Sequence, residues 1–156
     1  MLRWLILLAT HVTSLAIGFA LGVYFLPILT APPGPDVAVL QAASQAAMFK
    51  TRFERNLKGS DFLHWGDGEV RLAPDRISFE GRLAPGPDYK LYLTKSYVDT
   101  REGFLAVKAE ALRIGDIKTF NGFLVSVPPV ADVTAYTTVV AWCEAFNMFI
   151  SAGKYR

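Results

Sequence analysis

Cysteine is the scarcest reactive residue in the chain, because Cys143 is the only one among 156 residues. A single thiol excludes a disulfide within the chain and any zinc site built from several cysteines. In an exported protein such a thiol is free, bound to a cofactor or paired with another chain. No other side chain here is both strongly nucleophilic and redox-active. We therefore expect any chemistry of the protein to pass through Cys143 or a bound cofactor.

The chain also lacks an excess of positive charge. Of its 16 Lys and Arg residues only Arg3 precedes residue 36, which leaves 15 against 14 Asp and Glu. Nucleic-acid binding needs a clustered basic face that neutralises phosphates, so we expect no nucleic-acid partner. A hydrolase has little support, since no Ser-His-Asp arrangement or pair of carboxylates stands out and His64 is the only histidine beyond residue 35.

Residues 5–26 lack Asp, Glu, Lys and Arg. A helix of that length spans roughly 33 Å, enough to cross the hydrocarbon core of a bilayer. Trp4 and Tyr24 lie near its two ends, where aromatic rings prefer the membrane interface. A cleavable signal peptide is the competing interpretation. We favour an uncleaved signal anchor, because the apolar run is long and Ala31 is followed by the rigid pair Pro32-Pro33.

The charges on the two sides of residues 5–26 predict the orientation. Arg3 and the α-amino group flank the N-terminal side, and the first basic residue after the run is Lys50. The positive-inside rule then places the N-terminus in the cytoplasm. We expect a single-pass protein of the cell inner membrane whose C-terminal domain lies in the periplasm or the exterior.

A Pro-rich linker separates the apolar run from a segment of helix formers. Ala31-Pro32-Pro33-Gly34-Pro35 ends the first helix and makes a semi-rigid spacer. Asp36 suits the N-cap of a helix from Val37 to about Asn56, which contains no Gly or Pro and has apolar residues at helical spacing. The predicted organisation is therefore a signal-anchor transmembrane helix and linker in 1–35, an amphipathic juxtamembrane helix in 36–58 and a β domain in 59–156.

Beyond Ser60 short apolar runs alternate with Gly, Pro and Asp, a texture typical of all-β domains. We predict an antiparallel two-sheet sandwich or jelly-roll-like barrel. Its expected strands are Asp61–Trp65, Glu69–Ala73, Arg76–Glu80, Tyr89–Thr94, Ala109–Ile114, Phe120–Val127, Thr138–Glu144 and Asn147–Ala152.

Several short motifs follow one another between Gly59 and the C-terminus. They are Gly59-Ser60-Asp61-Phe62 with His64, Pro85-Gly86-Pro87-Asp88-Tyr89, Gly115-Asp116-Ile117-Lys118, Val127-Pro128, and Val139-Val140-Ala141-Trp142-Cys143. Their spacing resembles that of the DM-thirteen domain family, also described as the electron-transfer DM domain. The Gly-Pro-Asp corner and the Trp-Cys strand together are more specific than either alone.

The resemblance implies a compact β domain whose single cysteine serves in redox chemistry or electron transfer. The residue that takes this role here is Cys143. Family members accompany DOMON-type and b-type cytochrome modules, and this sequence shows no such module. We therefore expect a redox accessory domain with a separate electron partner, such as a cytochrome, more than a stand-alone enzyme. Residues 120–123, Phe-Asn-Gly-Phe, also depart from the polar Gln-x-Tyr pattern of the family.

The sequence around Cys143 leaves two hypotheses open, a reactive thiol and a structural one. Alternation along a strand places the thiol on one face with Val139 and Ala141, and Trp142 on the other. A reactive thiol needs partial exposure and a cationic or hydrogen-bonding neighbour, whereas an apolar face favours burial and a raised pKa. The alternative is therefore a ligand- or protein-binding envelope module in which the cysteine is structural.

His64 and Trp142 are weaker candidates for cofactor binding. His64 could relay protons, or join Cys143 and a carboxylate such as Asp88 in a copper or haem site if folding brings them together. A histidine at a strand end is more often satisfied by an ordinary hydrogen bond, and one histidine is too few for zinc, so we assign no metal ligands. Trp142 and other aromatics such as Tyr89 could line a ligand groove or carry electron hopping, although core packing is commoner.

Overall fold

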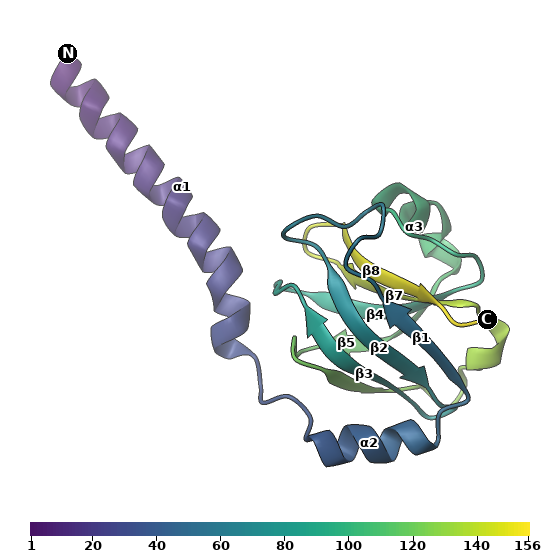
Figure 1. The fold of residues 1–156 in the computed structure, drawn as a ribbon. Coiled ribbons are helices and arrows are strands. Elements are labelled where there is room, and N and C mark those ends of the chain that lie inside the picture. The colour runs from purple at the N-terminus through teal and green to yellow at the C-terminus, as the bar shows by residue number, and fades with distance from the viewer.

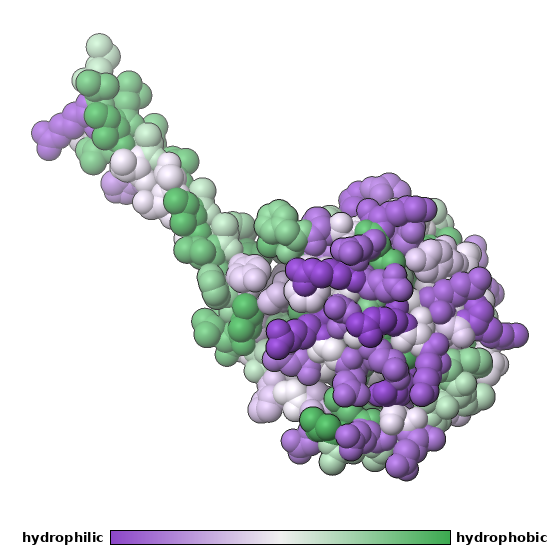
Figure 2. All heavy atoms as spheres, in the orientation of Figure 1, coloured by the Kyte–Doolittle hydropathy of each residue, from purple (hydrophilic) through white to green (hydrophobic).

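Helix α1 (Leu2–Thr30) projects from the rest of the molecule as an apolar rod in the computed structural model, which describes residues 1–156 (Figure 1). None of its residues is buried, and Figure 2 shows hydrophobic side chains along most of its length. The helix is long and apolar enough to cross a membrane, as signal sequences also are. It ends where Ala31 becomes extended ahead of Pro32 and Pro33.

Helix α2 (Val37–Gln45) is shorter than predicted. The helix expected to reach about Asn56 is wrong, because Phe49–Phe53 form strand β1 of the sandwich. In β1 the side chain of Phe53 is fully buried, whereas Lys50 and Arg52 are exposed. This two-residue alternation is the strand pattern, and it follows directly on an Ala- and Gln-rich stretch that favours a helix.

Eight strands form two antiparallel four-stranded sheets that pack face to face (Figure 1). One sheet, in the order β1-β2-β3-β6, contains β1, β2 (Gly66–Leu72), β3 (Arg76–Leu83) and β6 (Phe123–Ser126). The other, in the order β5-β4-β7-β8, contains β5 (Leu112–Ile117), β4 (Tyr89–Thr94), β7 (Thr138–Cys143) and β8 (Met148–Lys154). The predicted antiparallel sandwich is confirmed, although the domain is not strictly all-β.

A helical segment interrupts the β domain between β4 and β5. It consists of α3 (Arg101–Val107) and the 3-10 turn η1 (Lys108–Glu110), and a second 3-10 turn, η2 (Val133–Ala135), precedes β7. Thr100 caps α3, since its hydroxyl accepts a hydrogen bond of 3.0 Å from the amide of Gly103. The strand expected from Ala109 therefore begins only at Leu112.

The strand predicted over Asp61–Trp65 is wrong, because this segment is a loop. The carboxylate of Asp61 accepts hydrogen bonds from the amides of Leu63 (2.7 Å) and His64 (2.8 Å). Such bonds offer the backbone an alternative to a strand ladder. The loop places His64 beside the end of β7, as described below.

Strand β7 divides the interior into two hydrophobic clusters. All six of its residues are buried. Val139, Ala141 and Cys143 face the main core of 20 residues between the sheets. Trp142 faces a smaller cluster of seven residues, which α3 covers with Phe104. The alternation predicted for this strand is confirmed.

Candidate functional site

Cys143 is the last residue of β7, directly before the turn Glu144–Asn147 that leads into β8. Asn147 closes this turn in the left-handed region at φ 49°, a conformation that asparagine tolerates better than most residues. Across the sheet Cys143 lies opposite Tyr89 at the start of β4. The thiol thus lies where the core meets the end of the sandwich.

The thiol of Cys143 is free and almost completely buried, with 2% of the residue exposed. Burial raises its pKa, and hydrogen bonding to the backbone around Phe146 and Asp88 only partly opposes this effect. The raised pKa keeps the group protonated at neutral pH, and a thiol is a much weaker nucleophile than a thiolate. Both the buried position and the raised pKa agree with the apolar face expected from the sequence.

One cavity of about 470 Å³ is lined by both Cys143 and His64. Its other walls are α1 between Phe19 and Tyr24, the corner Pro85–Pro87, and the side chains of Leu63, Tyr89 and Phe146. No Asp, Glu, Lys or Arg lines it. The structure therefore brings two of the three predicted site residues to one apolar space.

The ring of His64 is held by the carboxylate of Asp61, with 2.9 Å between Nδ1 and Oδ2. The His64 side chain is 23% exposed. Partial burial alone would raise the pKa of Asp61, but hydrogen bonds from His64 and Leu63 outweigh it and hold the pKa below its usual value. With Nδ1 directed at the carboxylate, Nε2 remains available to a ligand or a proton.

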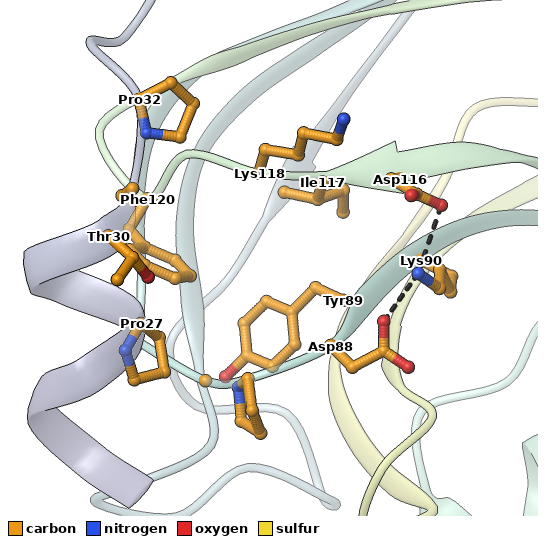
Figure 3. Close-up of a pocket in the computed structure, with 13 residues that line it drawn as sticks. Pro27, Thr30, Pro32, Asp88, Tyr89, Lys90, Asp116, Ile117, Lys118 and Phe120 are labelled. Atoms are coloured by element: carbon orange, nitrogen blue, oxygen red, sulfur yellow. Dashed lines mark ion pairs between the residues drawn. The ribbon is translucent and has the colours of Figure 1, made fainter. Parts of the chain in front are cut away.

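Tyr89 has an almost completely buried ring, and its hydroxyl reaches the cavity without a hydrogen-bond partner in the protein. The residue is 3% exposed, and its ring packs edge-on against Phe120 with 5.9 Å between centroids. Gly86 lies against the ring so closely that a Cβ at this position would collide with it. Figure 3 shows the ring directed toward α1 near Pro27. Burial raises the pKa of Tyr89 well above its ordinary value.

A second cavity of about 290 Å³ adjoins the first and shares Tyr89, Gly86 and Pro87 with it (Figure 3). Here Lys90 bridges two carboxylates, with Nζ 2.5 Å from Asp88 and 3.1 Å from Asp116. Asp88 is therefore engaged by Lys90 in the neighbouring cavity and does not line the one that holds Cys143 and His64.

Trp142, the third predicted site residue, lies on the opposite side of β7 and is fully buried. Its ring packs against Phe104 with 4.6 Å between centroids, and its indole N–H has no hydrogen-bond partner. Lys108 lies over the ring at 5.3 Å and donates to Glu144 at 2.6 Å, while the hydroxyl of Tyr92 also donates to Glu144. Sequence reasoning missed this polar group, because Lys108 comes from the unpredicted helical segment.

A family model described as electron transfer DM13 matches residues 56–155. The chain belongs to this family. The matched residues include all of the site described above except the wall made by α1, and they confirm the resemblance drawn from Gly59 onward. No curated protein and no solved structure matches the chain.

The side chains of this electron transfer DM13 domain do not form a complete metal site. No group of three or more His, Cys, Asp or Glu side chains is arranged so that it could hold a metal ion. In the main cavity only Cys143 and His64 could serve as ligands, and a protein copper site typically takes at least three. A copper or haem iron at this cavity would have to complete its coordination with ligands from another source.

Proposed function

We propose that this member of the electron transfer DM13 family is a membrane-anchored domain that passes electrons through Cys143 or a redox group bound beside it. The observation that carries the proposal is the single apolar cavity lined by Cys143 and His64, which lie 79 positions apart in the sequence.

The long apolar helix α1 supports the membrane part of the proposal. From Trp4 to Tyr24 a helix rises about 30 Å, which matches the hydrocarbon thickness of a bilayer and places both rings at the interfaces. With the N-terminus in the cytoplasm, the domain lies on the periplasmic or exterior side of the cell inner membrane. Its electron partner is then a membrane-associated or extracytoplasmic redox protein, such as a cytochrome, or a small molecule.

A second candidate function is a non-catalytic ligand- or protein-binding module. The burial of Cys143 and its raised thiol pKa favour this alternative, because both oppose attack by the sulfur. In that case the cysteine is a small core residue beside a binding cavity.

A redox titration of the full chain in lipid nanodiscs, followed by absorption and by electron uptake, separates the two functions. One thiol without a partner cysteine cannot cycle through a disulfide within the chain, so the electrons are held by a redox group bound beside Cys143 or attached to it. We expect the wild-type protein, purified with that group bound, to exchange electrons reversibly, and Cys143→Ser to lose this exchange or shift its midpoint. Cys143→Ala serves as a second variant that preserves the apolar face, and thermal unfolding reports whether each variant is folded. A wild-type chain that takes up no electrons, while both variants remain folded, would leave the binding module as the function.

A further inference from the structure

The cavity beside Cys143 has a composition that selects against charged ligands. Nine of its 13 lining residues are hydrophobic, and none is Asp, Glu, Lys or Arg. Nucleotide cofactors carry phosphates, which proteins bind with Arg, Lys or clustered backbone amides. At about 470 Å³ the cavity has the size of an ordinary small-molecule site, which spans roughly 300–1,000 Å³. Its walls therefore suit an uncharged, largely apolar molecule.

One wall of the cavity comes from the helix that we propose to lie in the bilayer. Phe19, Leu21 and Val23 line the cavity from α1, just before the interfacial position of Tyr24. Figure 2 shows that the hydrophobic surface of α1 continues down to the β domain. An apolar molecule in the outer leaflet can thus reach the cavity along α1 without crossing water.

Exposed apolar side chains of the β domain surround the same opening. Phe146 is 49% exposed and Leu63 is 41% exposed, and both line the cavity. Their neighbour Phe62 is 83% exposed. Large aromatic side chains near the proposed interfacial position of Tyr24 suit the boundary between lipid headgroups and acyl chains. With α1 in the membrane position proposed above, these side chains place the cavity side of the domain toward the bilayer surface.

Two hydrogen-bonding groups face this otherwise apolar space. The ring of Tyr89 is almost completely buried, but its hydroxyl has no hydrogen-bond partner within the protein and reaches the cavity, so a ligand oxygen can replace water as its acceptor. His64 contributes its ring from another element and is oriented by Asp61. A hydroxyl donor in an apolar pocket recognises a carbonyl oxygen, and an imidazole whose Nδ1–H donates to Asp61 offers Nε2 as an acceptor for a ligand hydroxyl.

We infer that this cavity binds the carbonyl-bearing ring of a lipid-soluble, quinone-class molecule, with the Tyr89 hydroxyl donating to one carbonyl oxygen and the apolar tail lying along α1 in the bilayer. The inference rests on the proposed function for the membrane position of α1 and for the choice of an electron-carrying ligand. It concerns binding alone, and Cys143 forms part of the wall.

Binding is tested by calorimetric titration of decylubiquinone into the full chain in phosphatidylcholine nanodiscs, with protein-free nanodiscs as the baseline. We expect saturable binding by the wild-type chain. Tyr89→Phe removes only the hydroxyl and is expected to weaken binding roughly threefold to tenfold, the value of one net hydrogen bond. The matched control is Tyr155→Phe, because its phenol donates to Val133 away from the cavity; it is expected to bind like the wild type.

A second pair of variants keeps the inference testable if Tyr89→Phe folds poorly. Phe146→Glu places a charge at the opening and is expected to weaken binding by at least roughly tenfold, because a carboxylate must be desolvated beside the ligand. Val130→Glu adds the same charge at a residue that is 96% exposed and does not line the cavity, and it is expected to change little. Wild-type affinity in both Tyr89→Phe and Phe146→Glu would overturn the inference.

Two further outcomes distinguish the ligand and the function. If decylubiquinone binds no more than to protein-free nanodiscs while native mass spectrometry retains a phospholipid, the cavity holds an acyl chain and the inference is overturned. The titration contains no electron donor, so it reports binding whether or not the protein transfers electrons. Binding without electron exchange would remove the proposed function, whereas electron exchange without binding would remove only this ligand.

Discussion

The two faces of strand β7 carry the two most distinctive side chains of the domain, and they differ in what surrounds them. Cys143 and Trp142 are adjacent in sequence and almost equally buried, at 2% and 0% exposure. The thiol borders an apolar cavity at the end of the sandwich, whereas the indole is enclosed by Phe104 and by the Lys108–Glu144 ion pair. The two residues are therefore alike in burial and differ in the space beside them, since only Cys143 borders a cavity that could hold a ligand.

The largest expected difference between the two faces is in stability. Trp142→Ala empties the centre of the smaller cluster and is expected to lower the free energy of unfolding by about 3–5 kcal/mol. Cys143→Ala removes a single atom beside an existing cavity and is expected to cost only about 1 kcal/mol. Urea unfolding of the full chain, followed by tryptophan fluorescence and circular dichroism, measures both. Equal losses would show that the thiol face is as tightly packed as the indole face.

Reagent access to the Cys143 thiol is expected to increase when a side chain that lines its cavity is removed, and to stay the same when a side chain on the Trp142 face is removed. Phe146→Ala removes a half-exposed ring from the cavity and is expected to raise the rate of Cys143 alkylation by N-ethylmaleimide roughly tenfold, equivalent to about 1.4 kcal/mol in the barrier. Leu105→Ala, at an exposed leucine of α3, is the matched control on the Trp142 face and is expected to leave the rate unchanged. Equal rates in all three proteins would mean that the thiol is reached only through unfolding.

The pH dependence of alkylation sharpens the same contrast. Only the thiolate reacts, and burial raises the pKa of Cys143, so the reactive fraction in the folded chain is smaller than in the unfolded chain at any pH near 8. An ordinary thiol has a pKa of about 8.5. The alkylation rate of the folded protein is expected to keep rising above this pH, because its thiol is still mostly protonated there. A rate profile for the folded chain with a midpoint at or below that of the urea-unfolded chain contradicts this expectation.

The smallest effect on stability is expected from the Lys108–Glu144 ion pair, which covers the ring of Trp142. Lys108→Gln removes the ion pair with Glu144 and the cation over the indole, and it is expected to reduce stability by about 1 kcal/mol. Lys95→Gln, at an exposed lysine without an ion pair, controls for the loss of charge. Thermal unfolding compares them, and equal midpoints would show that solvent screens the Lys108–Glu144 pair.

The sequence predicts strands correctly where the hydrophobic pattern and the neighbouring turn residues are sufficient by themselves. Tyr89–Thr94 was predicted with the same bounds as β4, because a Pro-rich corner precedes a strongly apolar run. The two faces of β7 also follow from alternation alone. The helix predicted across Phe49–Phe53 is wrong, because the preceding Ala- and Gln-rich stretch favours a helix. The strand that forms instead depends on pairing with β2, about 20 residues away. Helix α3 was missed because its stability comes from Phe104 packing on Trp142.

The candidate site could be predicted only in part. Cys143 and His64 were both chosen from the sequence, but their common cavity requires α1, the Pro85–Pro87 corner and the β7–β8 turn to come together. Tyr89 was noted only as one of several aromatics, because the absence of a partner for its hydroxyl depends on every neighbouring element. Long-range proximity of this kind leaves no periodic pattern in one chain.

The most direct test of the account is protein-film voltammetry of the full chain, comparing Cys143→Ser with Trp142→Phe. Each variant alters one face of β7: Cys143→Ser exchanges a single atom, and Trp142→Phe keeps an aromatic ring in the smaller cluster. The account predicts a reversible wave from the redox group bound beside Cys143 in the wild type and in Trp142→Phe, and its loss or displacement in a folded Cys143→Ser variant. An unchanged wave in Cys143→Ser, at the same potential and amplitude as the wild type, would contradict a role for the Cys143 cavity in electron transfer.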